Sequence, residues 1–308
     1  MLNFHGITKI FKSDLLSQPF VALDDVSFDI PGGAMVGFLG ANGAGKTTSI
    51  KIIMDFIRPD KGHVTFSKDL GEDKIKVFRN IGFLPERPYF YQNLTGMEFL
   101  FFMGALSELS RAHIQQEIKF WGPRFKIDHA LKRELKTYSK GMLQRIGFLA
   151  TILHGPELII LDEPLSGLDP IGRKELKDVI VEVHRKGKTV FFSSHIVPDI
   201  EEICDRVVFL KEGKLVYSGQ VDTLLKSNEE LEYIVKVKSE NLFPLSTQIV
   251  KRENYPGNLV MLTVKENLRV HLLDELIKTK VDIVGLEQVR PSLEEIFYKT
   301  RSAHAQPQ

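Results

Sequence analysis

Residues 40–47 read Gly-Ala-Asn-Gly-Ala-Gly-Lys-Thr and match the phosphate-binding pattern GxxxxGK[ST]. Glycines in such a loop let the backbone wrap closely around an anion, with its N–H groups pointing inward. The apolar run 35–39 before the loop predicts a buried strand, and the pattern of residues 47–56 predicts a helix. The start of that helix adds the positive end of its dipole. A strand, a glycine-rich loop and a helix in this order predict a site for nucleotide phosphates. A glycine turn without such a function is much less expected between a strand and a helix.

Individual positions of the loop have distinct expected contacts. Lys46 is expected to contact the β- and γ-phosphates, and the hydroxyl of Thr47 is expected to bind Mg²⁺. The remaining positions expected to contact the nucleotide are Gly40, Asn42, Gly43, Ala44, Gly45 and Thr48.

Two further apolar runs end in chemically competent side chains. Residues 158–161 are followed by Asp162 and Glu163, and residues 189–192 are followed by Ser193-Ser194-His195. The carboxyl ends of parallel strands share one edge of a sheet, so these side chains are expected beside the phosphate loop. Asp162 fits the residue that organises Mg²⁺, Glu163 fits the residue that polarises the attacking water, and His195 fits a hydrogen-bond partner of the γ-phosphate.

Short apolar runs alternate with helical patterns such as residues 173–186, which predicts an α/β fold with a largely parallel core sheet. Residues 21–39 predict two strands joined by a turn at 31–33. Residues 86–155 are aromatic-rich and mostly helical in pattern, which predicts an inserted helical subdomain. Its aromatic side chains form either a helix core or a groove for a partner helix. The groove candidates are Tyr89, Phe90, Leu94 and Phe99.

The last part of the chain, residues 221–308, predicts a small α+β unit. Its expected elements are strands at 231–238, 259–264 and 283–289, a helix at 267–279, a second helix opening at 291–292 and a frayed tail at 301–308.

Composition narrows the class of protein. Of 308 residues, 43% are hydrophobic and 26% are charged, which excludes disorder over most of the length. The net charge of +1 gives no global field for nucleic acid, and the single cysteine, Cys204, excludes a disulfide framework or a Cys-rich zinc site. No apolar run approaches the ~18–20 residues that span a bilayer, and no signal peptide is visible. We therefore expect a cytosolic chain whose membrane partner, if it has one, supplies the spanning part.

The remaining motifs indicate a resemblance to a known family. Tyr138-Ser139-Lys140-Gly141-Met142 precedes Asp162-Glu163, Ser166-Gly-Leu-Asp169 follows it, and His195 ends the next apolar run. With the phosphate loop, this order resembles the ATP-binding subunit of an ABC transporter over about residues 2–220. Residues 292–297 resemble the ending of exporter-type ATPases that pair with a separate permease. The resemblance implies a P-loop fold of ABC type with a mainly parallel core sheet, an antiparallel N-terminal subdomain, the helical subdomain and an accessory domain at 221–308.

Two positions depart from the family pattern. The signature usually reads Leu-Ser-Gly-Gly-Gln; here Ser139 and Gly141 are kept, and a hydroxyl, a glycine N–H and a helix N-terminus still make an anion site. Glu86 stands where the family usually has glutamine. A carboxylate still offers oxygen to Mg²⁺ but donates no hydrogen bond, so Glu86 is a predicted metal and nucleotide contact.

The resemblance also implies how the pieces combine. Phe11 is expected to stack on adenine. Each ATP is expected to lie between one chain's phosphate loop and the Ser139 and Gly141 of a second chain, with the Asp169 loop between them. We therefore expect a homodimer that closes on ATP, with ATP and Mg²⁺ as cofactors.

The function implied is ATP hydrolysis that drives an integral membrane permease as part of an exporter, with the chain peripheral on the cytoplasmic face of the membrane. One alternative is a soluble ATPase of the same superfamily acting on ribosomes or nucleic acid. Such relatives tend to carry two such domains or a long coiled-coil insertion, which this chain lacks. A second alternative is a nucleotide-binding regulator without turnover, which Glu86 and the altered signature suggest and which Lys46, Asp162, Glu163 and His195 argue against.

Overall fold

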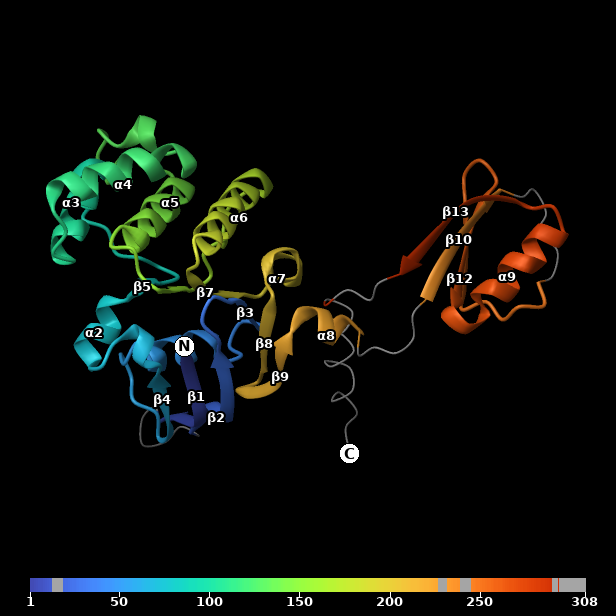
Figure 1. Ribbon diagram of the computed structural model, residues 1–308, viewed down its shortest axis with the longest axis horizontal. Coiled ribbons are helices and arrows are strands. Elements are labelled where there is room, and N and C mark those ends of the chain that lie inside the picture. The colour runs from blue at the N-terminus through green and yellow to red at the C-terminus, as the bar shows by residue number, and fades with distance from the viewer. Residues whose placement is uncertain (13–18, 227–231, 239–244, 290–292, 294–308) are drawn as a thin grey trace. The chain divides into compact units, whose positions relative to one another are not determined.

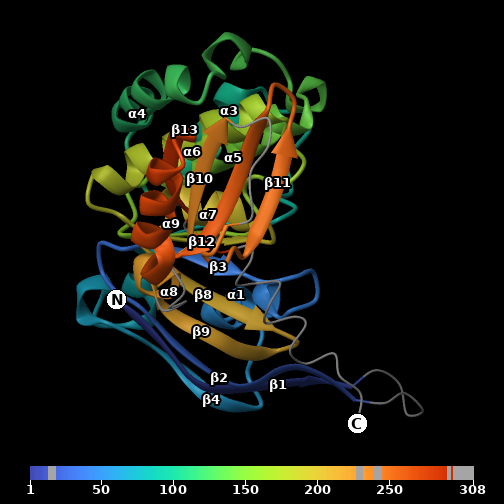
Figure 2. The ribbon, with the colours of Figure 1, turned by 90° about the vertical axis from the view of Figure 1, so that its right-hand side faces the viewer.

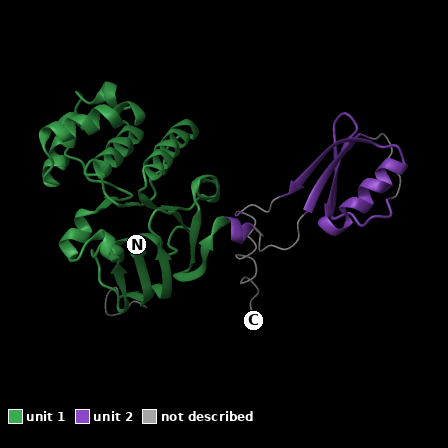
Figure 3. Ribbon diagram, viewed as in Figure 1, with its two compact units in different colours: residues 1–221 green, residues 222–308 purple. Residues whose placement is uncertain are grey.

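The computed structural model describes residues 1–12, 19–226, 232–238, 245–289 and Leu293 (Figure 1). The chain divides into two compact units, residues 1–221 and 222–308 (Figure 3). The helix expected to open at residues 291–292 and the tail expected at 301–308 lie outside the described residues.

A six-stranded sheet forms the centre of the first unit, and its strand order is β5-β6-β7-β3-β8-β9. The first five strands in this order, β5, β6, β7, β3 and β8, pair in parallel. The strand β9 lies at one edge and pairs antiparallel with β8. All residues of β3 and β6 are buried, as expected for strands covered on both faces. This confirms the predicted parallel core. The strands are β3 (Met35–Leu39), β5 (Ile81–Leu84), β6 (Leu158–Leu161), β7 (Thr189–Ser194), β8 (Arg206–Lys211) and β9 (Lys214–Gln220).

A second sheet of the first unit is antiparallel, with strand order β2-β1-β4 (Figure 2). It comprises β1 (Leu2–Phe11), β2 (Phe20–Ile30) and β4 (Lys61–Phe66). The strands predicted at 21–30 and 35–39 both form, but they lie in different sheets rather than pairing with each other. The two strands differ in burial, because β2 contains both buried and exposed residues whereas β3 is buried throughout. The aromatic rings of Phe4, Phe28, Phe38 and Phe191 pack against one another between the sheets.

The helices α2 to α6 of the first unit each begin at a residue whose side chain caps the helix. Asp169 accepts a hydrogen bond from the Gly172 N–H at 3.0 Å, and Pro170 occupies the first turn of α6. The helices around the central sheet are α1 (Lys46–Ile53), α2 (Lys74–Arg79), α6 (Pro170–Arg185) and α7 (Val197–Ile203), with a 3₁₀ turn at Lys68–Leu70. The helix α8 (Val221–Lys226) follows β9.

The inserted subdomain is helical, as predicted. It contains α3 (Gly96–Leu106), α4 (Arg111–Arg124), α5 (Lys140–Ile152) and 3₁₀ turns at Asp128–Ala130 and Leu135–Thr137. Thr95 and Glu98 cap α3 reciprocally. Trp121 and Phe99 are buried, so Phe99 belongs to the helix core and the prediction that it lines a groove was wrong. Its ring packs under Phe90 at a centroid distance of 5.4 Å.

The second unit is a four-stranded antiparallel sheet, β11-β12-β10-β13, with one helix packed on one face. Its elements are β10 (Glu232–Lys238), β11 (Lys251–Tyr255), β12 (Leu259–Lys265), α9 (Glu266–Lys278) and β13 (Asp282–Val289). The strand β11 was not predicted, because Lys-Arg-Glu-Asn-Tyr has no apolar alternation. Glu275 of α9 accepts hydrogen bonds from the N–H groups of Ser246 and Thr247, which lowers its pKa to about 2.

Candidate functional site

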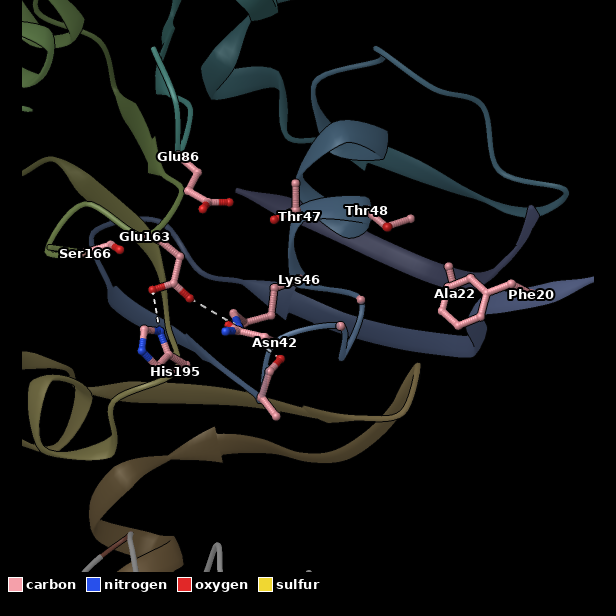
Figure 4. Close-up of a pocket in the computed structure, with 13 residues that line it drawn as sticks. Phe20, Ala22, Asn42, Lys46, Thr47, Thr48, Glu86, Glu163, Ser166 and His195 are labelled. Carbon is pink, nitrogen blue, oxygen red and sulfur yellow. Dashed lines mark hydrogen bonds and ion pairs between the residues drawn. The ribbon is translucent and has the colours of Figure 1, made fainter. Parts of the chain in front are cut away.

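A cavity of about 400 Å³ opens over the glycine-rich loop, beside the segments that follow β6 and β7 (Figure 4). The first unit places the ends of β3, β6 and β7 side by side, because these strands are neighbours in one parallel sheet. The residues that line the cavity are Phe20, Ala22, Ala41, Asn42, Gly43, Gly45, Lys46, Thr47, Thr48, Glu86, Glu163, Ser166 and His195.

The loop adopts a backbone that only glycine accepts at two positions. Gly43 has φ +81° and Gly45 has φ +103°. A Cβ atom on Gly45 would also lie 2.7 Å from Leu23 Cδ2 and 2.8 Å from the Ala22 carbonyl oxygen. The helix α1 starts immediately after Gly45, so its free N–H groups face the cavity entrance and suit an anion.

Lys46 is buried at the floor of the cavity. Its Nζ donates to the carbonyl oxygen of Gly40 at 2.6 Å and to that of Ala41 at 3.3 Å, and it lies 3.2 Å from Oε1 of Glu163. The approach to Glu163 is an ion pair without hydrogen-bond geometry. Oε1 of Glu163 is buried, and within the described part of the chain it accepts no hydrogen bond. A buried acceptor of this kind fits a bound water at the mouth of the phosphate loop.

The other oxygen of Glu163 is held by His195. Nδ1 of His195 lies 2.9 Å from Oε2 of Glu163, and the His195 side chain is 40% exposed toward the cavity (Figure 4). Glu163 itself has φ +49°, an uncommon conformation for a residue with a side chain. Strain of this kind is found at functional sites, where surrounding contacts fix it.

Asp162 is buried next to Thr47, and its environment suits a cation. Burial raises the pKa of Asp162, and the nearby carboxylates of Glu163 and Glu86 raise it further, while hydrogen bonds from Ser193 and Thr47 partly offset these effects. A divalent cation would favour the charged carboxylate. Oxygen ligands from a hydroxyl and carboxylates are the set that Mg²⁺ prefers, so these residues fit the ion.

The predicted site residues do not all meet here. The lining includes Asn42, Gly43, Gly45, Lys46, Thr47, Thr48, Glu86, Glu163 and His195, while Gly40, Ala44 and Asp162 lie behind it in the same loop and strand ends. Ser139 caps α5 by accepting from the Met142 N–H at 3.3 Å, Gly141 packs on Leu168, and Asp169 caps α6. None of these three lines the cavity of the same chain.

Two residues near the site, Ser193 and Phe20, were not predicted from the sequence. Ser193 follows the apolar run of β7 and contacts both Asp162 and Glu163, a connection that no local pattern reveals. Phe20 lines the cavity whereas Phe11 does not. Phe11 and Phe20 are directly paired across β1 and β2, so both lie on the same face of that sheet, and no local pattern tells which of them borders the loop.

The structure leads to a prediction for adenine stacking. Phe20→Ala should raise the KM for ATP by about tenfold, because stacking of a base on an aromatic ring contributes ~1–3 kcal/mol. Phe11→Ala is the matched control and should change the KM less than Phe20→Ala. A larger KM increase for Phe11→Ala in a steady-state ATPase assay would assign the stacking position to Phe11.

Fold and site together define a nucleotide-binding protein of the P-loop class, and comparison with known proteins gives the family. The ABC transporter family model matches residues 23–166, and the model described as ATP-binding protein DrrA1-3-like, C-terminal domain, matches residues 219–300. An ABC transporter ATP-binding protein of Synechocystis is 36% identical over 95% of this chain and 82% of its own length. The bacitracin transport ATP-binding protein BcrA of Bacillus licheniformis is 32% identical over 90% and 92%.

A solved structure of an ATP-binding subunit of an ABC transporter is also similar, at 28% identity and a TM-score of 0.64, over 73% of this chain and 92% of that one. The chain belongs to the ABC transporter ATP-binding proteins. It is an ATP-binding and hydrolysing subunit that powers transport. The comparisons give no support to the alternative of action on ribosomes. In the described residues, every helix is too short or too polar to cross a bilayer.

Proposed function

We propose that this chain hydrolyses Mg·ATP with Glu163 as the general base. The observation that supports this is the Glu163 carboxylate, fixed between His195 and Lys46, with one buried oxygen that accepts no hydrogen bond within the described residues. That oxygen accepts the proton of the attacking water. Lys46 and the loop N–H groups stabilise the charge on the phosphates, and His195 orients Glu163 and contacts the γ-phosphate.

In this proposal Thr47, Asp162 and Glu86 would hold Mg²⁺. The ion would supply charge neutralisation to the phosphates of the nucleotide. Within the described residues no cationic side chain forms an ion pair with the buried Asp162 carboxylate, which supports this assignment, because a bound cation would stabilise its charged form.

A second copy of the chain completes the site. Ser139 and Gly141 lie at the N-terminus of α5 and do not line the cavity of their own chain. A hydroxyl, a glycine and a helix N-terminus form an anion site that is available to a nucleotide held by a partner. We propose a head-to-tail homodimer that closes on ATP, with the Asp169 loops at its centre, and opens after hydrolysis.

The permease is proposed to dock on an aromatic groove close to Glu86 in the sequence. A groove of about 630 Å³ is lined by Tyr89, Phe90, Tyr91, Gln92, Asn93, Leu94 and Phe102. The side chains of Tyr89, Tyr91 and Phe102 are 85%, 51% and 38% exposed and meet in edge-to-face pairs. Exposed aromatic side chains gathered in one groove are suited to a partner helix. Two residues separate Glu86 from Tyr89, the first residue of this groove, which is a short path for coupling.

Charge in this groove is predicted to uncouple the chain from its permease. Tyr89→Glu should abolish co-purification of the membrane subunit in mild detergent and leave basal ATP turnover within about twofold, because an exposed carboxylate is costly to bury in an apolar interface. Val270→Glu, which adds a charge at an exposed position on α9, is the control. Loss of basal turnover in Tyr89→Glu, with the permease still bound, would assign Tyr89 to the helical core instead.

The direction of transport is proposed to be export, and the location is the cytoplasmic face of the membrane. The bacitracin transport relative and the DrrA1-3-like C-terminal match support a drug-exporter type. The second unit is proposed to be an accessory domain that follows the ATPase.

A further inference from the structure

Ser193 of β7 stands between the two acidic residues of the site. Its side chain is fully buried. Oγ lies 2.7 Å from Oδ1 of Asp162 and 2.8 Å from the backbone nitrogen of Glu163. One hydroxyl therefore joins the carboxylate assigned to the metal with the backbone of the residue assigned as base.

The directions of these two hydrogen bonds are fixed by chemistry. The Glu163 N–H can only donate, so the Ser193 oxygen accepts there. The single hydroxyl proton of Ser193 is then directed to Oδ1 of Asp162, so one hydroxyl makes both bonds at once.

The bond to the Glu163 N–H acts on an unusual stretch of backbone. Glu163 has φ +49°, which its own side chain disfavours. A buried hydrogen bond to its amide holds this conformation and so fixes where the carboxylate stands, 2.9 Å from His195 and 3.2 Å from Lys46.

We propose that Ser193 is a positioning residue that ties the backbone of Glu163 to the side chain of Asp162. This inference rests on the proposed function of those two residues. Ser193 does not itself line the cavity, so its loss should act on turnover through Glu163 and Asp162 and leave ATP affinity unchanged. The adjacent Ser194 does not share this position, because its hydroxyl bonds the backbone of Ile196.

The test compares three variants of the full chain. Ser193→Ala removes the hydroxyl, and Ser193→Thr retains it. Thr189→Val removes a different buried hydroxyl, at the far end of the same strand, where Thr189 accepts from the Gly33 N–H at 2.8 Å. For each variant we would measure kcat, the Kd of a fluorescent ATP analogue, and the melting temperature.

We expect Ser193→Ala to lower kcat by about 10- to 100-fold, the usual effect of removing a partner behind a metal ligand, with the Kd within about twofold of wild type. Ser193→Thr should recover most of kcat, and Thr189→Val should lower the melting temperature with no loss of kcat. Wild-type kcat in Ser193→Ala would overturn the inference, as would an equal loss in the alanine and threonine variants or in Thr189→Val.

Glu163→Gln, measured alongside, separates this inference from the proposed function. An inactive Glu163→Gln with a fully active Ser193→Ala would refute only the role of Ser193. A fully active Glu163→Gln would refute the general base and the role of Ser193 together.

Discussion

Glu163→Gln should lower ATP turnover by about a thousandfold, because a general base contributes ~10²–10⁴-fold and an amide cannot accept the proton. The substitution keeps the size of the side chain and its position 2.9 Å from His195. ATP binding should persist, since the glycine-rich loop and Lys46 are untouched. The measurement is phosphate release under saturating Mg·ATP.

The same variant should accumulate the ATP-bound dimer, because hydrolysis is the step that opens it. Light scattering with Mg·ATP should report twice the monomer mass. Glu157→Gln is the control; Glu157 lies just before β6 and contacts Lys188 rather than the cavity. A monomer at high protein concentration would indicate that a different partner or a membrane scaffold is needed for pairing, and undiminished turnover would contradict the assignment of the base.

Lys46→Met should weaken ATP binding by more than a hundredfold, because truncating one partner of a buried, hydrogen-bonded charge pair costs ~2–5 kcal/mol. In the structure the Lys46 ammonium has two carbonyl oxygens and one carboxylate around it, and it is placed to exchange these for phosphate oxygens. Its removal also leaves the Glu163 carboxylate without its nearest cation.

Lys51→Met is the matched control for this loss, since Lys51 lies on the same helix, α1, with an exposed side chain. Equilibrium dialysis with ATP compares the two variants. Affinity retained in Lys46→Met would show that the loop N–H groups carry phosphate binding without the lysine.

Much of the candidate site could be predicted from the sequence because its residues follow strand ends. Asp162 and His195 come directly after the buried runs of β6 and β7, and parallel strands bring such ends to one edge. The pattern of the loop at residues 40–47 is equally local. The parallel core sheet and the helical subdomain were predicted on the same basis, from apolar runs and helical periodicity.

The features that could not be predicted from the sequence depend on contacts between distant segments. The packing of β2 against the glycine-rich loop places Phe20 rather than Phe11 in the cavity lining. The burial of Phe99 depends on how α3 packs against Phe90. The contact of Ser193 with Asp162 spans 31 residues and arises only from strand order. Assignment of β2 and β3 to different sheets likewise requires knowing which face of each strand is covered.

ATP turnover in this chain is expected to drive a membrane permease. The most direct test is a pull-down of the tagged chain from native membranes in mild detergent, with the bound proteins identified by mass spectrometry. We predict a stoichiometric polytopic membrane protein, lost in Tyr89→Glu. Recovery of ribosomal proteins or nucleic acid, with no membrane partner, would contradict the account and favour a soluble ATPase whose groove at Tyr89, Tyr91 and Phe102 binds another target.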